Sequence, residues 1–547
     1  MRIKILLLML LFLCVGMTAT AQNPTVTGKV TDAQGEPLVG ATVKVDGTKN
    51  ATVTDIDGLF SIAAKKSEKL TVSYIGYQSR SVTIDRMQNL TIVLDASLNE
   101  MDEAIVVGYG LQKKSDIATA VSSVNVEDLA KSGSSQVLQA LQGKVSGVQV
   151  MSSDGSLSGN MQFRIRGVNS ITGGTQPLFV IDGVPMPVQP IDETTSGLSN
   201  NPMMGLNPND IASIEILKDA AAAAIYGAKG SNGVVLITTR QGQASAHPKF
   251  AFGLTTGLDF MPSLPLKTLS PEEYAYKMRK YGTYDSPNLI QFWDKVIEKQ
   301  GWNDPSVHNW LDEITQTAHK TELNASMQGG SKGLTYMLSA GYVNNSGVIR
   351  RSRFDRFTSR LNLTQQLGDK ASVGLNSSFS TSKDRNPTTD WSQAGVVLNA
   401  LQRSPFLFYP GFAGIMNYSN INIMSPLVAV EQVNINNKYD ELNSNLWFSY
   451  NILPSLTFNT SGSYRRYTVN STREWGSETW FGQSEQGRME LGSREENSWV
   501  WEARLQYART LGRHSFSFMG GFEASKWWSK NLYAKATNFE DMLQGIY

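Results

Sequence analysis

Cysteine is almost absent from this sequence, because Cys14 is the only one among 547 residues. It lies in an N-terminal segment that we expect the mature protein to lose. A mature chain without cysteine excludes disulfide bonds, thiolate metal sites and a cysteine nucleophile. Stability is therefore expected to come from buried apolar surface and backbone pairing.

Two other absences narrow the class of protein. Basic and acidic residues number 49 and 48, so no overall field points to nucleic acid or to an acidic substrate. Beyond the N-terminus no apolar run approaches the ~18 residues that indicate a membrane-spanning helix, which excludes a helical membrane protein. A transmembrane β-barrel is not excluded, because its strands are short and only alternate residues face lipid.

The N-terminus reads as a secretory signal peptide, residues 1–21. Arg2 and Lys4 precede an apolar run from Ile5 to Met17, and Ala19-Thr20-Ala21 has the form of a cleavage site. The run is shorter than the ~20 residues of a spanning helix. We expect an exported chain that begins near Gln22, and its length predicts several domains.

Residues 26–95 alternate in short segments such as ATVKVDGTK and DGLFSIA, separated by Gly-containing turn dipeptides. This pattern predicts a small β-sandwich. Asp55 and Asp57 in TDIDG resemble calcium ligands, but Asp-Gly is commoner as turn chemistry. The Glu that closes an EF-hand loop is also missing.

Residues 111–240 mix two periodicities. Behind a Ser134/Ser135 cap, apolar residues recur at helical spacing and predict a short helix that runs into a strand. The stretch AAAAAIYG predicts a second helix that ends at Gly227. Short strands and many glycines complete what we expect to be a compact α/β domain.

The segment FRIRG within that domain separates two kinds of side chain. Phe163 and Ile165 point to one face of a strand, whereas Arg164 and Arg166 point to the other. The arginine pair is either a solvated edge or a polar contact with a charged wall.

From residue 249 onward the sequence alternates in nine longer segments: 249–260, 319–329, 333–343, 353–366, 370–381, 442–452, 455–467, 497–510 and 513–525. Tight connections at 329–333, 368–370, 453–455 and 511–514 alternate mostly with long ones, notably 261–318, 382–441 and 468–496. Short turns on one side and long loops on the other are typical of an outer-membrane barrel.

Aromatic residues near the strand ends fit an interfacial girdle, although a soluble β protein would use them in its core. They are Tyr342, Phe354, Phe357, Trp447, Tyr450, Tyr464, Trp501 and Tyr507.

No catalytic constellation emerges. His319 and Glu322 have the spacing of a zinc-peptidase pair, but an offset of three places them on opposite faces of a strand. The glycine-rich stretches lack the P-loop pattern. We expect no enzyme activity, no cofactor and no metal site, and no residues stand out as substrate ligands.

Several stretches together resemble the SusC/RagA type of TonB-linked outer membrane proteins. GKVTDAQGEPLVGATVKVDGT is similar to the family's carboxypeptidase-regulatory-like domain. LQGKVSGVQV, FRIRGVNS, PLFVIDGVP and SIEILKDAAAAAIYGAKGSNGVVLITTRQG are similar to its plug. GLTYMLSAGYVNNSGVI is similar to its early barrel strands.

The resemblance implies a mainly β protein of several parts. We expect a signal peptide (1–21), a β-sandwich (22–97), a TonB-box-like linker (98–112), an α/β plug domain (113–245) and the first strands of a transmembrane antiparallel β-barrel (246–547). Family barrels have about 22 strands around a plug. With nine strands the barrel is incomplete, so we expect a truncated chain. Arg164 and Arg166 become candidate contacts of plug and barrel, and Asp182-Gly183 is expected to form a turn.

The implied function is import of a bulky nutrient, an oligosaccharide or a peptide, across the outer membrane. The implied partners are TonB, a SusD-like surface lipoprotein and outer-membrane lipid, with no nucleic acid. The alternatives are a receptor that signals inward and a surface or periplasmic ligand-binding protein.

An apolar run between the sandwich and the plug, DEAIVVGYG, is the candidate contact for TonB. A short extended segment between domains can add itself as a strand to a partner's sheet. The candidate residues are Asp102, Glu103, Ala104, Ile105, Val106, Val107 and Gly108, with 105–107 as the core. The alternative is a strand paired inside the plug.

Overall fold

The computed structural model describes residues 25–538, with gaps. The gaps of more than five residues are 95–103, 114–120, 127–133, 168–174, 187–200, 388–394 and 407–425, and shorter ones lie between them. The expected signal peptide lies outside the described residues. The chain divides into two compact units, Met1–Ile105 with Lys113–Asp116, and Val106–Gln112 with Ile117–Tyr547.

Short strands build the first unit. They are β1 (Thr25–Asp32), β2 (Thr42–Val45), β3 (Ala51–Val53), β4 (Leu59–Ala63), β5 (Lys69–Ser73), β6 (Arg80–Thr83) and β7 (Leu90–Leu94). Two sheets result, ordered β4-β1-β7 and β3-β2-β5-β6. Alternate residues of β2 and β4 are buried, and the apolar faces share one core that includes Phe60 and Leu70. The predicted β-sandwich is confirmed.

The turn before β4 shows how an Asp-Gly pair acts in this unit. The Oδ1 atom of Asp55 accepts hydrogen bonds from the backbone N–H of Asp57 (3.0 Å) and of Leu59 (2.8 Å). Gly58 has a φ of 73°, and a Cβ there would overlap the carbonyl oxygen of Val30. The Asp55 carboxylate therefore stabilises the turn.

The second unit contains a small α/β domain, here called the plug. Its elements are β10 (Val121–Val124), α3 (Val137–Ala140), β11 (Val148–Ser152), β12 (Met161–Ile165), β13 (Leu178–Ile181), β14 (Val184–Met186), η3 (Pro208–Asp210), β15 (Ile211–Leu217), η4 (Ala224–Gly230) and β16 (Val234–Thr239). One sheet has the order β10-β15-β16-β13-β14, with β13 and β16 parallel, and β11 pairs with β12.

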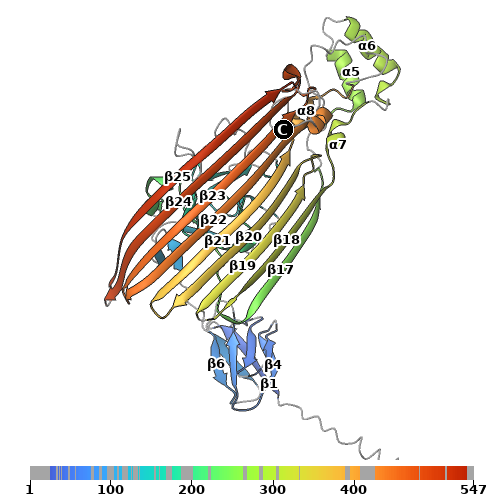
Figure 1. The fold of residues 1–547 in the computed structure, drawn as a ribbon. Coiled ribbons are helices and arrows are strands. Elements are labelled where there is room, and N and C mark those ends of the chain that lie inside the picture. The colour runs from blue at the N-terminus through green and yellow to red at the C-terminus, as the bar shows by residue number, and fades with distance from the viewer. Residues whose placement is uncertain are drawn as a thin grey trace, which may run out of the picture. The chain divides into compact units, whose positions relative to one another are not determined.

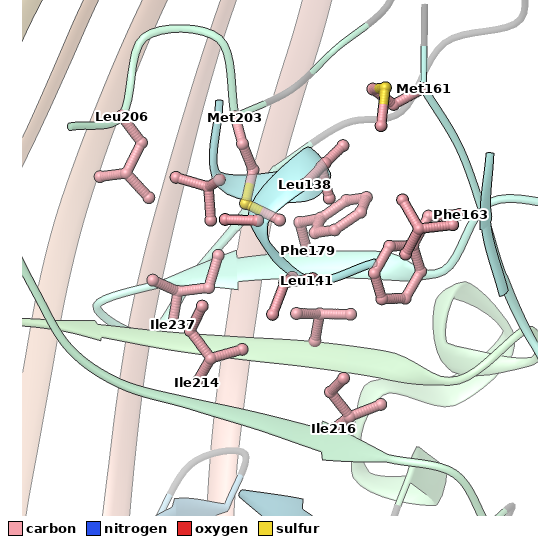
Figure 2. Packing of buried hydrophobic residues seen from close by; sticks show 14 of the residues in the cluster. Leu138, Leu141, Met161, Phe163, Phe179, Met203, Leu206, Ile214, Ile216 and Ile237 are labelled. Atoms are coloured by element: carbon pink, nitrogen blue, oxygen red, sulfur yellow. The ribbon is translucent and has the colours of Figure 1, made fainter. Parts of the chain in front are cut away.

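An apolar core holds the plug together. Leu138 and Leu141, from α3 and the residue after it, lie beside Ile214 and Ile237 of the larger sheet (Figure 2). Phe163 and Phe179 meet edge to face with ring centroids 5.8 Å apart. This packing gives the plug a core of its own, which is separate from the sheet described next.

The first predicted helix of the plug is shorter than its pattern suggested, and residues 220–222 of the second lie outside the described residues. The first, α3, spans four residues, and Ser134 Oγ accepts a hydrogen bond from the N–H of its N-cap Gln136. In the alanine-rich stretch the described 3₁₀ segment η4 consists of two short helices separated by a kink at Gly227. Gly227 has a non-helical φ of 57° and ψ of −144°, so the first of these helices ends there, as predicted.

The rest of the second unit is one antiparallel sheet, here called the wall sheet (Figure 1). Its strands are β17 (Ser245–Asp259), β18 (Ala318–Gly330), β19 (Leu334–Ser346), β20 (Arg353–Leu367), β21 (Ala371–Asn386), β22 (Val433–Leu453), β23 (Leu456–Trp475), β24 (Arg488–Leu511) and β25 (His514–Thr537). The nine strands pair in sequence order, as predicted, and several extend well beyond the predicted ends.

Two long connections of the wall sheet carry helices. Between β17 and β18 lie α5 (Pro271–Tyr281), α6 (Pro287–Glu298), η5 (Gly301–Asn303) and α7 (Trp310–Ile314). Between β21 and β22 lie α8 (Val396–Gln402) and α9 (Pro426–Gln432), and η7 (Gln483–Glu485) precedes β24. Trp310 of α7 shares a buried cluster with Val396 of α8 and Val430 of α9, so the two long connections pack together. Across the described residues, no helix has the length and apolarity to cross a membrane.

The two faces of the wall sheet differ sharply in polarity. On β20, Arg356, Arg360 and Asn362 are buried on the face toward the plug. On the opposite face Phe357 of β20 is 40% exposed and Phe252 of β17 is 75% exposed. A polar inner face and an apolar outer face are the pattern of a transmembrane barrel wall.

Most of the predicted girdle aromatics lie on the outer face, but two do not. Tyr342, Phe357, Tyr450, Tyr464 and Trp501 are 39–49% exposed. Phe354, in contrast, is fully buried against Met204 of the plug, and Trp447 lines a cavity at the inner face. The position of an aromatic residue near a strand end therefore did not predict the face of the sheet on which it lies.

Candidate functional site

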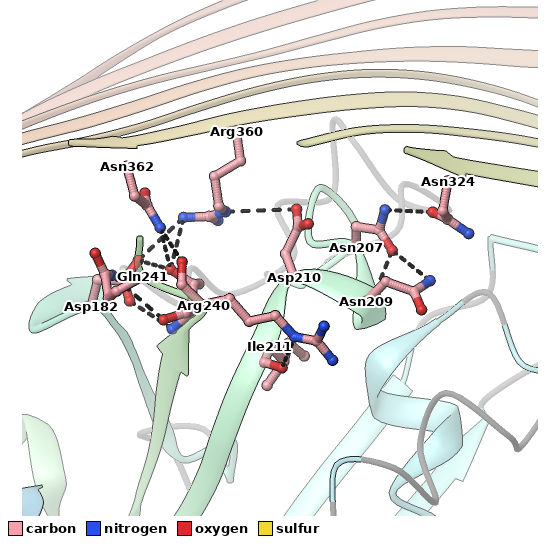
Figure 3. A network of polar contacts seen from close by, with 11 residues as sticks. Asp182, Asn207, Asn209, Asp210, Ile211, Arg240, Gln241, Asn324, Arg360 and Asn362 are labelled. Atoms are coloured by element: carbon pink, nitrogen blue, oxygen red, sulfur yellow. Dashed lines mark hydrogen bonds and ion pairs between the residues drawn. The ribbon is translucent and has the colours of Figure 1, made fainter. Parts of the chain in front are cut away.

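The candidate site is the contact between the plug and the inner face of the wall sheet. Figure 3 shows its centre, where Asp182, Asp210 and Arg240 of the plug lie close to Arg360 and Asn362 of β20. The plug residues come from the β13–β14 turn, from η3 and from the end of β16. Segments far apart in sequence therefore meet at one strand of the wall.

The β13–β14 turn aims a carboxylate at the wall. Asp182 and Gly183 both have positive φ, 49° and 85°, as a two-residue hairpin turn requires, so the predicted turn is confirmed. The two Asp182 oxygens accept hydrogen bonds from the backbone N–H and the hydroxyl of Thr239, both at 2.8 Å. The end of β16 thereby fixes the Asp182 side chain.

Arg360 of the wall binds this carboxylate. Its Nη1 lies 3.2 Å from Asp182 Oδ2, and the two side chains are 6% and 7% exposed. Asn362, two residues along β20, donates from Nδ2 to Thr239 Oγ1 (3.1 Å) and to the carbonyl of Arg240 (2.7 Å). Charge-assisted hydrogen bonds between buried groups are directional, and a buried group that loses its partner costs free energy of folding.

Asp210 supplies a second carboxylate to the same guanidinium. Its Oδ2 lies 3.7 Å from Arg360 Nε. Burial raises the pKa of Asp210, and the nearby positive charge of Arg360 opposes this rise. The η3 segment that carries Asp210 is capped at its N-terminus by Asn207, whose Oδ1 accepts a hydrogen bond from the N–H of Asn209 at 3.0 Å. Arg360 therefore links two separate plug segments.

The loop before η3 makes a second set of contacts. Asn207 Nδ2 donates to Asn324 Oδ1 of β18 at 2.7 Å, and Arg356 Nη1 donates to the carbonyl of Met204 at 2.9 Å. The Met204 side chain enters an apolar cluster of the wall that includes Phe354. At Gly205 a Cβ would overlap Ser380 Oγ and Glu441 Oε2 of the wall.

A third contact lies nearer the loop end of the strands. Ser158 of the plug donates a hydrogen bond to Asp384 of β21, and Asn386 donates from Nδ2 to Ser158 Oγ at 3.1 Å. Polar contacts thus fasten the plug to β18, β20 and β21.

Arg164 and Arg166, the predicted wall contacts, have their described polar partners inside the plug. Arg164 Nη2 donates to Gln162 Oε1 at 2.9 Å, and Arg166 forms an ion pair with Asp219. Phe163 and Ile165 are buried in the plug core, as the alternation predicted. At the described centre of the contact the wall provides the guanidinium and the plug provides the carboxylates, and a contact of Arg164 or Arg166 with the wall stays a prediction.

Sequence reasoning missed Asp182, Asp210 and Arg360. Asp182 was interpreted only as a turn residue, and nothing in a strand pattern distinguishes Arg360 from an arginine that faces a water-filled lumen. The signal that could have found Arg360 is the alternation along β20, which places Arg356, Arg360 and Asn362 on the same inward face.

A cavity of about 330 Å³ lies beside the Asp182–Gly183 turn. Gln241 of the plug and Trp447, Glu502 and Arg504 of the wall contribute to its lining. At about 30 Å³ per water molecule it can hold several waters. The contact therefore has room for water next to its best-fixed ion pair.

The candidate TonB contact is only partly within the described residues. Asp102, Glu103 and Gly108 lie outside them, and for 104–107 only the backbone is described. That backbone forms β8 (Ala104–Val107), which pairs with β9 (Gly110–Lys113) in a sheet of two strands. Within the described chain β8 is not part of the plug sheets.

The site contains no arrangement with an evident chemical reaction. Its carboxylates and guanidiniums bind one another, and among the described residues no three His, Cys, Asp or Glu side chains cluster to hold a metal ion. The geometry is that of a polar contact between two folded parts.

Comparison with known proteins assigns the plug and the β-sandwich. Residues 113–234 match the family model described as "TonB-dependent Receptor Plug Domain", and residues 26–106 match a "CarboxypepD_reg-like domain". The chain is 32% identical to TonB-dependent receptor SusC of Bacteroides thetaiotaomicron over 95% of its length and 52% of that protein. It is 30% identical to a TonB-dependent receptor of Formosa agariphila over 98% of its length and 49% of that protein.

The chain thus spans about half the length of the curated relatives that it matches. In fold, it resembles the RagAB peptide importer in its open-open state, with a TM-score of 0.65 and 22% identity over 81% of this chain and 51% of that one. The sandwich, the plug and the wall sheet occur here in one chain, and the chain belongs to the SusC/RagA type of TonB-dependent receptors.

Proposed function

We propose that this protein takes part in TonB-dependent import of a bulky nutrient across the outer membrane. The observation that carries the proposal is the nature of the contact between plug and wall. The plug has its own apolar core, whereas polar groups centred on Arg360, Asp182 and Asp210 fasten it to the wall. Hydrogen bonds and ion pairs of this kind can be exchanged for bonds to water, so the plug can leave the wall as a folded body.

The nutrient is an oligosaccharide or a peptide, and a SusD-like surface lipoprotein covers the loop end. Two findings support this. One solved relative in fold is described as a peptide importer. The long loops also carry helices with buried aromatic clusters, such as Phe292, Trp293 and Phe406, which give that end a structured surface.

TonB binds the segment from Asp102 to Gly108, with Ile105 to Val107 as the gripped core. The extended backbone of β8, in a sheet of only two strands among the described residues, supports this role. A strand of this kind has a second edge with which it can add to a partner's sheet. TonB then pulls on a segment directly before the plug.

The test is a proline at the centre of this segment. Val106→Pro removes one backbone donor and should reduce TonB-dependent uptake to the level of a strain without TonB. Val106→Ala keeps the N–H group and should retain uptake. Growth on individual oligosaccharides and on casein peptides gives the readout, with the amount of protein in the outer membrane measured in parallel. Normal uptake by Val106→Pro at a normal protein level would refute the assignment.

A further inference from the structure

Four basic side chains gather on the outer face of the wall sheet, near its loop end. They are Arg353 on β20, Lys383 and Arg385 on β21, and Lys438 on β22, three neighbouring strands (Figure 1). Each is out of phase with the buried inner-face residues of its strand, so each faces away from the plug. The side chains of Arg353 and Lys438 are 58% and 47% exposed.

The strand register places like charges directly opposite each other. Arg353 is paired across the sheet with Arg385, and Lys383 with Lys438. Such pairs destabilise a sheet, because their side chains are held only about 5 Å apart at Cβ. Two adjacent pairs concentrate positive charge that a bound anion would relieve.

The protein itself compensates this charge only in part. Asp355 binds Arg353 at 2.8 Å, and Asp440 binds Lys438 at 3.0 Å. Lys383 makes no hydrogen bond or ion pair within the described part of the chain, and Asp355, directly opposite it on β20, is paired with Arg353.

Arg385 makes its contact with a neutral group. It donates from Nη2 to Asn434 Oδ1 at 2.6 Å, and Arg351 donates to the same oxygen at 3.0 Å. Glu474 lies one contact further away, where it accepts from Asn434 Nδ2 at 3.1 Å. At Asn434 Oδ1 the charged neighbour of Arg385 is therefore a second guanidinium, and the Glu474 carboxylate lies beyond the Asn434 amide.

The four basic residues line a groove of about 450 Å³, here called the outer groove. Its other outer-face lining residues are Asp355, Asn436, Asn470 and Thr472, and it also touches Asp384 and Asn437, whose side chains are buried on the inner face. The Asn436 and Asn470 amides and the Thr472 hydroxyl add neutral donors to the cations. Guanidinium and ammonium groups together with such donors match the oxygens of a phosphate group.

The outer groove adjoins the apolar band of the wall. Tyr342 and Phe357, paired across β19 and β20, are each 40% exposed and lie on the side of the groove toward the tight turns. Further along, Phe379 and Leu446 continue the exposed apolar surface. Aromatic residues mark the boundary between hydrocarbon and headgroups in membrane barrels. The groove therefore lies at headgroup level, a step that rests on the outer-membrane location proposed above.

We propose that the outer groove binds the phosphate-bearing headgroup of a lipid in the outer leaflet. The acyl chains lie along the apolar band, and the phosphate is held between the two like-charged pairs. Lys383 and Lys438 provide point charges, while Arg353 and Arg385 provide planar donors. The site lies on the face opposite the plug and takes no part in import itself.

The experiment measures lipid binding by native mass spectrometry of the protein purified from outer membranes in detergent. The probes are monophosphoryl lipid A, the same lipid without its phosphate, and inorganic phosphate alone. Only the phosphorylated lipid should bind well. The variant Lys383→Gln/Lys438→Gln should bind it about 25-fold more weakly, from roughly a five-fold loss for each cation.

The matched control is Lys249→Gln/Lys370→Gln, which also removes two lysine charges, but from the tight-turn end of the sheet. It should bind the lipid as the unchanged protein does. The proposal is overturned if both lipids bind equally, if inorganic phosphate binds as tightly as the lipid, or if the groove variant binds normally. The assay needs neither TonB nor uptake, so its failure is distinguishable from failure of the import proposal.

Discussion

Arg360 is the residue on which the contact between plug and wall depends most. It bonds Asp182, 178 positions earlier, and lies 3.7 Å from Asp210. The alternation of β20 predicts which way Arg360 points, but no local pattern can indicate partners so distant in sequence. The same holds for Asp182, whose turn was predictable from Asp-Gly although its bond to the wall was not. In the Arg164/Arg166 pair, β12 ends at Ile165, so Arg166, with a φ of 55°, leaves the strand and pairs with the plug's own Asp219.

Removing the Arg360 charge should loosen the plug. Arg360→Met keeps most of the side-chain volume but leaves two buried carboxylates without their cation. Breaking a buried pair in this way costs about 3–5 kcal/mol. Hydrogen exchange of residues 178–186 should therefore accelerate by roughly 150-fold or more. The control is Arg466→Met on β23, whose exposed pair with Glu495 should be worth less than about 1 kcal/mol. Similar protection in both variants would contradict a central role for Arg360.

At the scale of elements, the wall strands were predictable and their outer ends were not. We expected a strand at 442–452, whereas β22 runs from Val433 to Leu453. Its additional part contains Asn434, Asn436, Lys438 and Asp440 on the outer face and buried Val433 and Tyr439 on the inner face, the reverse of the pattern of a lipid-facing strand. Backbone pairing continues beyond the membrane although the hydrophobic signal stops at it. The loop helices were missed for a related reason, because only length was used to assign those segments.

The loop from Met203 to Leu206 fits against the wall only because Gly205 has no side chain. Gly205→Val places atoms where Ser380 Oγ and Glu441 Oε2 lie, and overpacking of this kind costs about 1–3 kcal/mol. The amides of Met204 and Leu206, which donate to Asn201 and Met203 carbonyls, should exchange roughly 5- to 150-fold faster.

Gly462→Ala is the control for that substitution, since a Cβ at Gly462 meets nothing within 4 Å. Stability should change by no more than about 0.5 kcal/mol there. If Gly205→Val leaves exchange of the loop unchanged, the loop does not lie as tightly against the wall as its geometry indicates.

At the scale of the whole molecule, two kinds of packing divide the second unit. The plug is held internally by apolar burial, whereas it is joined to the wall mainly by hydrogen bonds and ion pairs. Sequence patterns predicted the existence of both parts because each has a strong local periodicity. They could not predict the contact, which depends on side chains brought together by the fold. Import as proposed requires that this contact opens while the plug core stays intact.

A reversible tether tests whether the contact must open. Cys14 is the only native cysteine and lies in the expected signal peptide, so two engineered thiols would be the only ones in the mature protein. Asn207→Cys/Asn324→Cys places them on plug and wall at a site where the native side chains bond at 2.7 Å. A short bis-thiosulfonate linker should abolish uptake, and a reducing agent should restore it. Asn376→Cys/Asn445→Cys joins two paired wall strands and should leave uptake unchanged when linked. Uptake that persists after complete linkage of plug to wall would mean that this part of the plug stays in place during import. The opening would then have to occur at the other end of the contact, beside the cavity near Asp182.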